Sequence, residues 1–185
     1  MSGLRVIAGK ARGRKLNAVP GDSTRPITDR TKESLFNILG ADVRDSRWLD
    51  LFAGTGSVGI EALSRGAAFV RFVDIVRQAV DTVRTNLKLT GLEASAEVLR
   101  LDAFSLLARQ PDQTYEYVYI APPQYKELWK QALSKLDENP GWLAEDAWVI
   151  VQIHPVEYAP LELNNLIEFE QRKYGSTLLV FFERS

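Results

Sequence analysis

The sequence predicts an α/β fold with a mostly parallel β-sheet, because strand-like and helix-like segments alternate from residue 48 onward. Buried-strand patterns lie near 48–52, 68–74, 96–101, 115–120 and 147–152, and helical patterns lie near 56–65, 75–90, 103–109 and 124–138. Such alternation is typical of parallel strands covered by helices on both faces. The end of the chain departs from it, because Leu166–Tyr174 and Thr177–Glu183 flank a Gly-Ser turn and predict an antiparallel hairpin.

A glycine turn follows the first of these strands. The apolar run from Trp48 to Phe52 carries one acid, Asp50, and leads into Gly54 and Gly56 before a helical pattern begins. Glycines supply the φ freedom that a tight turn needs. The helix behind them offers unpaired N–H groups at its N-terminus. The stretch therefore predicts a site for a cofactor that contains a nucleoside.

The acids near this turn bear on the identity of the cofactor. Gly54, Gly56 and Gly59 match the dinucleotide fingerprint, so NAD is one alternative and a plain strand–turn–helix is another. Asp50 would repel a pyrophosphate, whereas it suits the ammonium and sulfonium groups of S-adenosylmethionine (SAM). Asp74 ends the second strand, where an acid accepts hydrogen bonds from ribose hydroxyls in either cofactor. SAM is the preferred interpretation because of Asp50.

The loop after the third strand offers a place for the adenine. Asp102 is expected to accept from the adenine amino group, and Phe104 to pack on the ring. The alternative is that Asp102 caps the next helix. The two roles are compatible.

A Pro-Pro turn follows the fourth strand, at the edge where ligands of open parallel sheets bind. Prolines fix φ and remove N–H donors, so the carbonyls of Ala121 and Pro122 beside Pro123 are candidate acceptors in a pocket. Tyr125, with Trp129 one turn further, is a candidate to stack on a planar base. The alternative is a rigid strand-to-helix turn.

The charges of the chain are segregated. Residues 1–32 hold eight Lys or Arg against two acids, net +6, whereas residues 33–185 hold fifteen against twenty-two, net −7. A basic arm on an acidic body predicts contact with a polyanion, and a solvated tail is the alternative. The candidate phosphate contacts are Arg5, Lys10, Arg12, Arg14, Lys15, Arg25, Arg30 and Lys32.

The arm itself is expected to be a small β-hairpin, with strands at 4–8 and 14–19 around a turn at 9–13. We therefore divide the chain into an extension, 1–24, and a main domain, 25–185. Thr28 is predicted to cap a helix that ends at Gly40. Arg25, Arg30 and Lys32 lie at the start of this helix. We expect them to form a phosphate-contacting surface or a lid on the cofactor pocket.

Composition excludes several classes of site. A chain of 185 residues with 45% hydrophobic content and no cysteine predicts one domain without disulfides, thiolate nucleophile or cysteine metal site. His154 is the single histidine, and we interpret it as a loop or core residue with a satisfied partner. No apolar run approaches about 18 residues and no signal-peptide pattern opens the chain. We expect a cytoplasmic protein without a membrane span, by default a monomer.

Four stretches and the Pro122-Pro123 turn together carry a specific resemblance. The stretches are LRVIAGK from residue 4, GRKL from residue 13, TRP and TDRTKESLFNIL within 24–39, and DLFAGTGSVGIEALSRGA from residue 50. With them the chain resembles the RsmD family of bacterial 16S rRNA (guanine-N2) methyltransferases over nearly its whole length.

The resemblance implies a class I SAM-dependent methyltransferase fold, Rossmann-like, with an N-terminal extension that contacts RNA. It implies methylation of the exocyclic amine of one guanine in 16S rRNA or the 30S subunit. In this view Asp50, Gly54 and Gly56 hold the methionine end of SAM. The other implied roles are Asp74 for the ribose, Asp102 and Phe104 for the adenine, Ala121, Pro122 and Pro123 for the target amine, and Tyr125 for stacking.

One departure from the family's pattern affects the expected chemistry. The family carries Asp-Pro-Pro-Tyr or Asp-Pro-Pro-Phe, whereas this chain has Ala121 in place of the Asp and Gln124 at the aromatic position. Loss of one electrostatic stabiliser slows a reaction by roughly 100-fold. Backbone carbonyls and the Gln124 oxygen are the candidate substitutes. The alternatives are a catalytically weakened SAM- and RNA-binding assembly factor, and a methyltransferase for another amine, such as adenine N6 in DNA or a small molecule.

Overall fold

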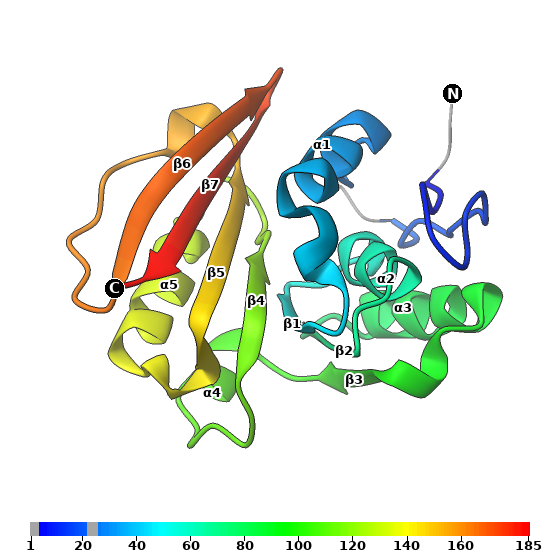
Figure 1. Ribbon diagram of the computed structural model, residues 1–185, viewed down its shortest axis with the longest axis horizontal. Helices are drawn as coiled ribbons and strands as arrows, with labels where there is room; N and C mark the ends of the chain where they lie inside the picture. Colours follow the sequence, from blue (N-terminus) through cyan, green and yellow to red (C-terminus); the bar gives the residue numbers. More distant parts are fainter. Residues whose placement is uncertain (1–3, 22–25) are drawn as a thin grey trace.

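A seven-stranded sheet in the order β3-β2-β1-β4-β5-β7-β6 forms the centre of the computed structural model, which describes residues 4–21 and 26–185 (Figure 1). Strands β1 to β5 are parallel, and β7 pairs antiparallel with both β5 and β6. The strands are β1 Arg47–Leu51, β2 Phe69–Asp74, β3 Ala96–Arg100, β4 Tyr115–Ile120, β5 Leu143–Ile153, β6 Leu166–Tyr174 and β7 Thr177–Arg184. The predicted parallel sheet with a C-terminal antiparallel hairpin is confirmed.

Helices cover both faces of this sheet (Figure 1). One apolar cluster joins one face to α1 Asp29–Leu39, α2 Ser57–Ser64 and α3 Arg77–Thr90. A second cluster joins the other face to α4 Ala103–Leu107 and α5 Leu128–Glu138. Short 3₁₀ turns η1 Gly40–Val43, η2 Glu93–Ser95, η3 Pro140–Trp142 and η4 Pro155–Glu157 complete the described elements.

The strand order reverses beside β1. The chain runs from β1 outward through β2 to β3, and then crosses back so that β4 lies on the other side of β1. The loops that leave the carboxyl ends of β1 and β4 therefore diverge to opposite faces. In open α/β sheets, ligands bind in the crevice at such a switch point.

The start of α5 differs from the prediction. The helix begins at Leu128 instead of residue 124, because Tyr125 and Glu127 adopt left-handed φ values of 65° and 55°. Residues in that region cannot continue a right-handed helix. Residues 121–127 therefore form a loop at the carboxyl end of β4. By contrast, α1 begins and ends as predicted, with Thr28 as its cap and Gly40 after it.

The N-terminal arm is a shorter form of the predicted hairpin, in which backbone hydrogen bonds join Val6 to Arg14, Gly13 to Val6 and Leu16 to Leu4. Its two sides meet in one antiparallel bridge, Arg5 with Lys15. Its backbone also bonds to α2: Ile7 and Ala8 donate to the Glu61 carboxylate at 2.9 and 3.1 Å. At Gly9, a Cβ atom would lie 1.9 Å from the Ser64 carbonyl oxygen. The hairpin is therefore shorter than predicted, and acceptors on α2 bind the N–H groups that face away from its partner side.

Candidate active site

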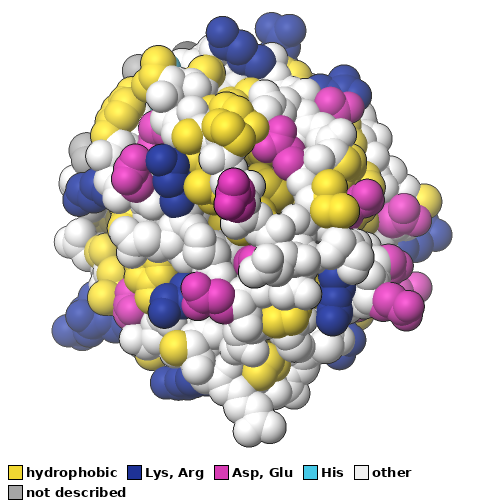
Figure 2. All heavy atoms as spheres, turned by 90° about the vertical axis from the view of Figure 1, so that its left-hand side faces the viewer, with side chains coloured by type: hydrophobic (Ala, Val, Ile, Leu, Met, Phe, Trp, Pro, Cys, Tyr) yellow, Lys and Arg dark blue, Asp and Glu magenta, His cyan; other side chains and the backbone are white. Residues whose placement is uncertain are grey.

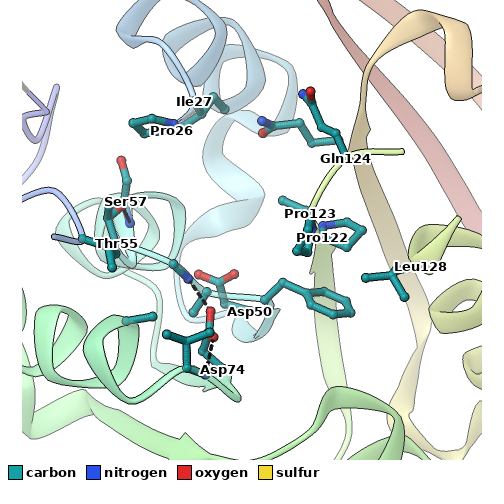
Figure 3. Close-up of a pocket in the computed structure, with 18 of the residues that line it drawn as sticks. Pro26, Ile27, Asp50, Thr55, Ser57, Asp74, Pro122, Pro123, Gln124 and Leu128 are labelled. Carbon is teal, nitrogen blue, oxygen red and sulfur yellow. Dashed lines mark hydrogen bonds between the residues drawn. The ribbon is translucent and has the colours of Figure 1, made fainter. Parts of the chain in front are cut away.

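A cavity of about 980 Å³ lies at the carboxyl ends of β1, β2, β4 and β5 (Figure 3). This volume is at the upper end of the range for sites that enclose a small ligand. Pro26 and Ile27, just before α1, form its far wall. It is lined by the predicted residues Asp50, Gly54, Asp74, Asp102, Phe104, Ala121, Pro122, Pro123 and Tyr125.

The three glycines of the turn have different surroundings. Gly54 lines the cavity at a φ of 58°, which favours glycine. Gly56 also has positive φ, but a Cβ there would lie 3.2 Å from the Val83 side chain of α3, and the residue does not line the cavity. At Gly59 a Cβ would lie 2.3 Å from the Phe72 ring. Gly56 therefore shapes the turn and its contact with the cofactor stays a prediction, while Gly59 permits close helix–sheet packing.

Asp50 is buried with an unsatisfied oxygen. Its side chain lies between the glycine turn and the Pro-Pro loop, on the floor of the cavity (Figure 3). It is 2% exposed, and its Oδ2 has no hydrogen-bond partner among the described residues. Burial raises the pKa of this carboxyl well above its usual range, and the nearby charge of Asp74 raises it further. A buried carboxylate of this kind is stabilised by a cationic ligand group.

Asp74 joins the first two strand ends. Its Oδ2 accepts from the Gly54 amide and its Oδ1 from the Val76 amide, both at 2.9 Å (Figure 3). Each carboxylate oxygen has a second lone pair for a further donor. The contact with a ribose stays a prediction. Ile75, the next residue along the chain, is exposed and lines the cavity. The sequence did not predict it as a site residue.

Asp102 caps α4, as one of the two predicted roles requires. Its Oδ2 accepts from the Ser105 amide at 3.0 Å. Phe104 meets Phe52 edge to face, with ring centroids 5.9 Å apart. Phe52 was not predicted as a site residue, although an aromatic residue just before the glycine turn could have indicated a wall for the adenine. Its backbone holds an unusual φ of 59°. The two rings provide an apolar wall next to Asp102.

The Pro-Pro loop carries no carboxylate that lines the cavity. Of the acids in the described ranges, the cavity is lined by Asp50, Asp74 and Asp102, all on the β1–β3 side. Glu157 instead fastens the loop from outside, because its Oε1 accepts from the Tyr125 amide at 2.9 Å and its Oε2 from the His154 amide at 3.0 Å.

The aromatic residues near this loop differ in exposure. Tyr125 is 64% exposed at the cavity, with its ring 5.8 Å from that of His154. Trp129 is buried in the core below α5, against Tyr158. The prediction that Trp129 stacks on a base is therefore wrong, because it occupies the core-facing side of the helix. The His154 Nδ1 accepts from the Val156 amide at 3.1 Å, which confirms its interpretation as a satisfied loop residue.

Six predicted phosphate contacts are exposed. They are Arg5, Lys10, Arg12, Arg14, Lys15 and Arg30. Arg5 also pairs with Asp29 at 2.9 Å. Arg25 lies outside the described residues. On the side of β6 and the segment that leads to it, positive and negative side chains are instead interspersed (Figure 2).

Lys32 is not a phosphate contact. The side chain is fully buried, and its Nζ donates to the Arg5 carbonyl at 2.7 Å and to Ser57 Oγ at 2.9 Å. It lies 3.5 Å from the Glu61 carboxylate. Burial lowers the pKa of this amine, while Glu61 opposes the shift. The prediction was wrong because Lys32 lies on the core-facing side of α1, where it ties the arm to the first turn of α2.

The fold and the cavity define an α/β methyltransferase, as the comparisons show. The solved structure described as "Putative methyltransferase yhhF from Escherichia coli" superimposes with a TM-score of 0.87 at 33% identity, covering 100% of this chain and 99% of that one. The family described as "Conserved hypothetical protein 95" matches residues 4–183. The chain belongs to this family.

Named relatives support the same assignment. "Putative rRNA methyltransferase YlbH" of Bacillus subtilis is 39% identical over 183 residues, 98% of this chain and 99% of the relative. "Ribosomal RNA small subunit methyltransferase D" of Escherichia coli K12 is 38% identical over 149 residues, 80% of this chain and 74% of the relative. The predicted resemblance to the RsmD family is confirmed. In the described ranges, no helix is long and apolar enough to cross a membrane, and no group of potential metal ligands is found.

Proposed function

We propose that this protein methylates the N2 amine of a guanine in 16S rRNA with SAM as the methyl donor. The observation that carries the proposal is Asp50, a buried carboxylate with an unpartnered oxygen on the floor of the cavity. A cofactor with an ammonium group supplies the missing partner. The relatives named as rRNA methyltransferases support the substrate class.

The residues on the β1–β3 side of the cavity support a site for SAM. Asp50 and the Gly54 region would hold the methionine end, and Asp74 would accept from the ribose. Asp102 would accept from the adenine amine, beside the apolar wall that the rings of Phe52 and Phe104 form. When bound, SAM supplies an electrophilic methyl group on a sulfonium centre.

The β4–β5 side would receive the target base. The carbonyls of Ala121 and Pro122 would accept from its amine, Pro123 would keep the loop rigid, and Tyr125 would stack on its face. The base must leave its helical stack to enter the cavity. The exposed cations of the arm would contact phosphates of the 16S rRNA or 30S subunit, and residues 1–24 would act as the RNA-contacting extension. We propose a cytoplasmic monomer.

The function is tested by methyl transfer from labelled SAM to 16S rRNA or 30S subunits that lack the native modification, with nucleoside analysis of the product. We expect N2-methylguanosine at one position and SAM binding by calorimetry. N6-methyladenosine would replace the proposal by another target amine. Absence of SAM binding would refute it.

A second candidate is a SAM- and RNA-binding assembly factor with weak or no turnover. It is favoured by one observation: among the residues that the structure describes, no carboxylate lines the β4–β5 side of the cavity. Tight SAM binding and rRNA binding without transfer would support it. A large gain of turnover on Ala121→Asp substitution would identify the missing carboxylate as the reason.

A further inference from the structure

Three polar side chains from adjacent strands share one face of the sheet. Asp50 of β1 pairs in register with Tyr119 of β4, and Tyr119 pairs with Ile150 of β5. Gln152, two residues beyond Ile150, projects from the same face because side chains alternate along a strand. Asp50, Tyr119 and Gln152 all line the cavity.

Gln152 also lies beside the position of the missing carboxylate. The last registered pair of β4 and β5 is Ile120 with Val151, so Ala121 and Gln152 occupy the next positions of the two strands. Ala121 follows Tyr119 by two residues and shares its face. A side chain at Gln152 therefore faces the same part of the cavity as one at Ala121, and both line it.

The Gln152 amide is held at one atom and free at others. Its Oε1 accepts from the Tyr119 hydroxyl. Tyr119 is buried, and burial raises the pKa of its phenol well above the usual range, so the hydroxyl stays a neutral donor. An amide oxygen has a second lone pair and the NH₂ group has two donors. Among the described residues, no other side-chain hydrogen bond to Gln152 is present.

An amide with a free acceptor and a free donor matches the amine edge of a purine. Guanine presents N2–H beside the N3 acceptor, and adenine presents N6–H beside N7, which glutamine pairs with in two hydrogen bonds. We propose that Gln152, positioned by Tyr119, binds the amine edge of the target purine and supplies the side-chain acceptor that Ala121 lacks. This inference rests on the proposed function and adds the residue that recognises the target.

Gln124 is a weaker candidate for the same role. It lies in the exposed loop after β4, whereas Gln152 lies on a strand of the sheet. A side chain fixed by a buried hydroxyl loses less freedom when it binds a base. Because a neutral acceptor forms weaker hydrogen bonds than a carboxylate, Gln152 is a partial substitute for the family's aspartate.

The test measures single-turnover methyl transfer to 16S rRNA lacking the modification, together with SAM affinity by calorimetry and the thermal midpoint. Gln152→Ala is expected to slow transfer roughly 100-fold, as does removal of one stabilising hydrogen-bond partner elsewhere. Tyr119→Phe is expected to slow it about tenfold, since the amide keeps its chemistry but loses its position. SAM affinity is expected to stay within about twofold in Gln152→Ala, because β4 lies between the strand of Gln152 and that of Asp50. Tyr119→Phe keeps the ring beside Asp50 and removes only the hydroxyl that donates to Gln152.

Two further variants separate recognition from a merely structural role. In an Ala121→Asp background, Gln152→Ala is expected to cost less than about fivefold, because the new carboxylate takes over the amine. Gln171→Ala is the matched control, since this glutamine lies on β6 outside the cavity and bonds to Glu168. It is expected to leave transfer unchanged.

The outcomes distinguish this inference from the proposed function. If the unaltered protein transfers no methyl group to rRNA, both fail. If it is active and Gln152→Ala remains within about twofold of it, the inference alone is overturned. A slow Gln152→Ala variant that Ala121→Asp does not rescue also overturns it, because the effect is then structural.

Discussion

The two halves of the cavity differ in charge. The half at the ends of β1, β2 and β3 holds Asp50, Asp74 and Asp102, whereas the described residues at the ends of β4 and β5 present prolines, neutral amides and one cation, Lys126. An anionic half suits a cationic cofactor, and a half whose acceptors are neutral suits an uncharged amine on a base. Under the proposed function, the difference means that cofactor binding and target activation would depend on separate residues, so each can be changed alone.

The halves also differ in how they are fastened. The glycine turn is tied to the arm, because the Asn86 amide donates to the Thr55 carbonyl at 2.9 Å and to the Asn17 carbonyl at 3.0 Å. Lys32 makes a second tie through Ser57. The Pro-Pro loop is held by Glu157 at Tyr125. A substitution that disrupts the packing of the arm is therefore expected to lower SAM affinity more than it affects the binding of the target base.

The largest expected effect is a loss of SAM affinity from a substitution in the cofactor half. Asp50→Asn removes the buried charge that would pair with the cofactor, and loss of such a partner costs about 3 kcal/mol, roughly 100-fold in the SAM dissociation constant. rRNA affinity should stay unchanged. Calorimetry measures SAM affinity, and an RNA binding assay measures rRNA affinity. A loss of both would contradict the independence of the two halves.

The same carboxyl makes SAM affinity depend on pH. Its pKa is raised in the free protein, so a proton must leave before a cation binds, and affinity should rise about tenfold per pH unit below that pKa. Folding responds with the opposite sign. The folded state holds the proton more tightly than the unfolded state, so stability falls as pH rises from about 3.8 towards the raised value.

The control for both effects is Asp50→Asn, which should flatten the affinity profile and raise the thermal midpoint of the free protein at pH 7. Binding titrations and thermal melts between pH 5 and pH 8 measure them. An identical pH slope in the variant would assign the titration to another group.

A substitution in the target half should change the rate of methyl transfer without changing SAM affinity. Ala121→Asp restores a charged acceptor beside the target amine, and the rate of transfer should rise on the order of tenfold while SAM affinity stays constant. Single-turnover kinetics and calorimetry measure the two. No gain in rate would mean that the neutral amide and the loop carbonyls already suffice.

The smallest expected effect tests a surface outside both halves. Arg12 and Arg14 are exposed on the arm. The double substitution Arg12→Gln/Arg14→Gln should weaken rRNA binding several-fold and reduce the slope of log affinity against log salt by about 2, one per lost phosphate contact. SAM affinity should not change. An unaltered salt slope would remove these two residues from the RNA surface.

Local pattern was sufficient for the sheet and for the acids at its edge. Alternating strand and helix segments predicted β1 to β5, and the Gly-Ser turn predicted the β6–β7 hairpin. Asp50 and Asp74 were found because parallel strands bring their carboxyl ends to one edge, which follows from chain order. These features depend on residues close together in sequence, so periodicity carries the information.

Side-chain direction was harder to predict. Lys32 and Trp129 each lie on a helix in a pattern that allows either exposure or burial. Their surroundings come from distant parts of the chain, Glu61 for Lys32 and Tyr158 for Trp129. The attachment of the short N-terminal hairpin to α2 was missed for the same reason, since its acceptors Glu61 and Ser64 lie far along the chain.

The sequence by itself determined the fold class, the glycine turn, the cofactor-side acids and the loss of the motif aspartate at Ala121, because each is a property of local order and composition. The tertiary structure decided which side chains meet. It left Asp50 with an unpaired oxygen, buried Lys32, and placed Gln152 against Tyr119. These outcomes depend on sheet register and helix packing, which join residues that the chain keeps far apart.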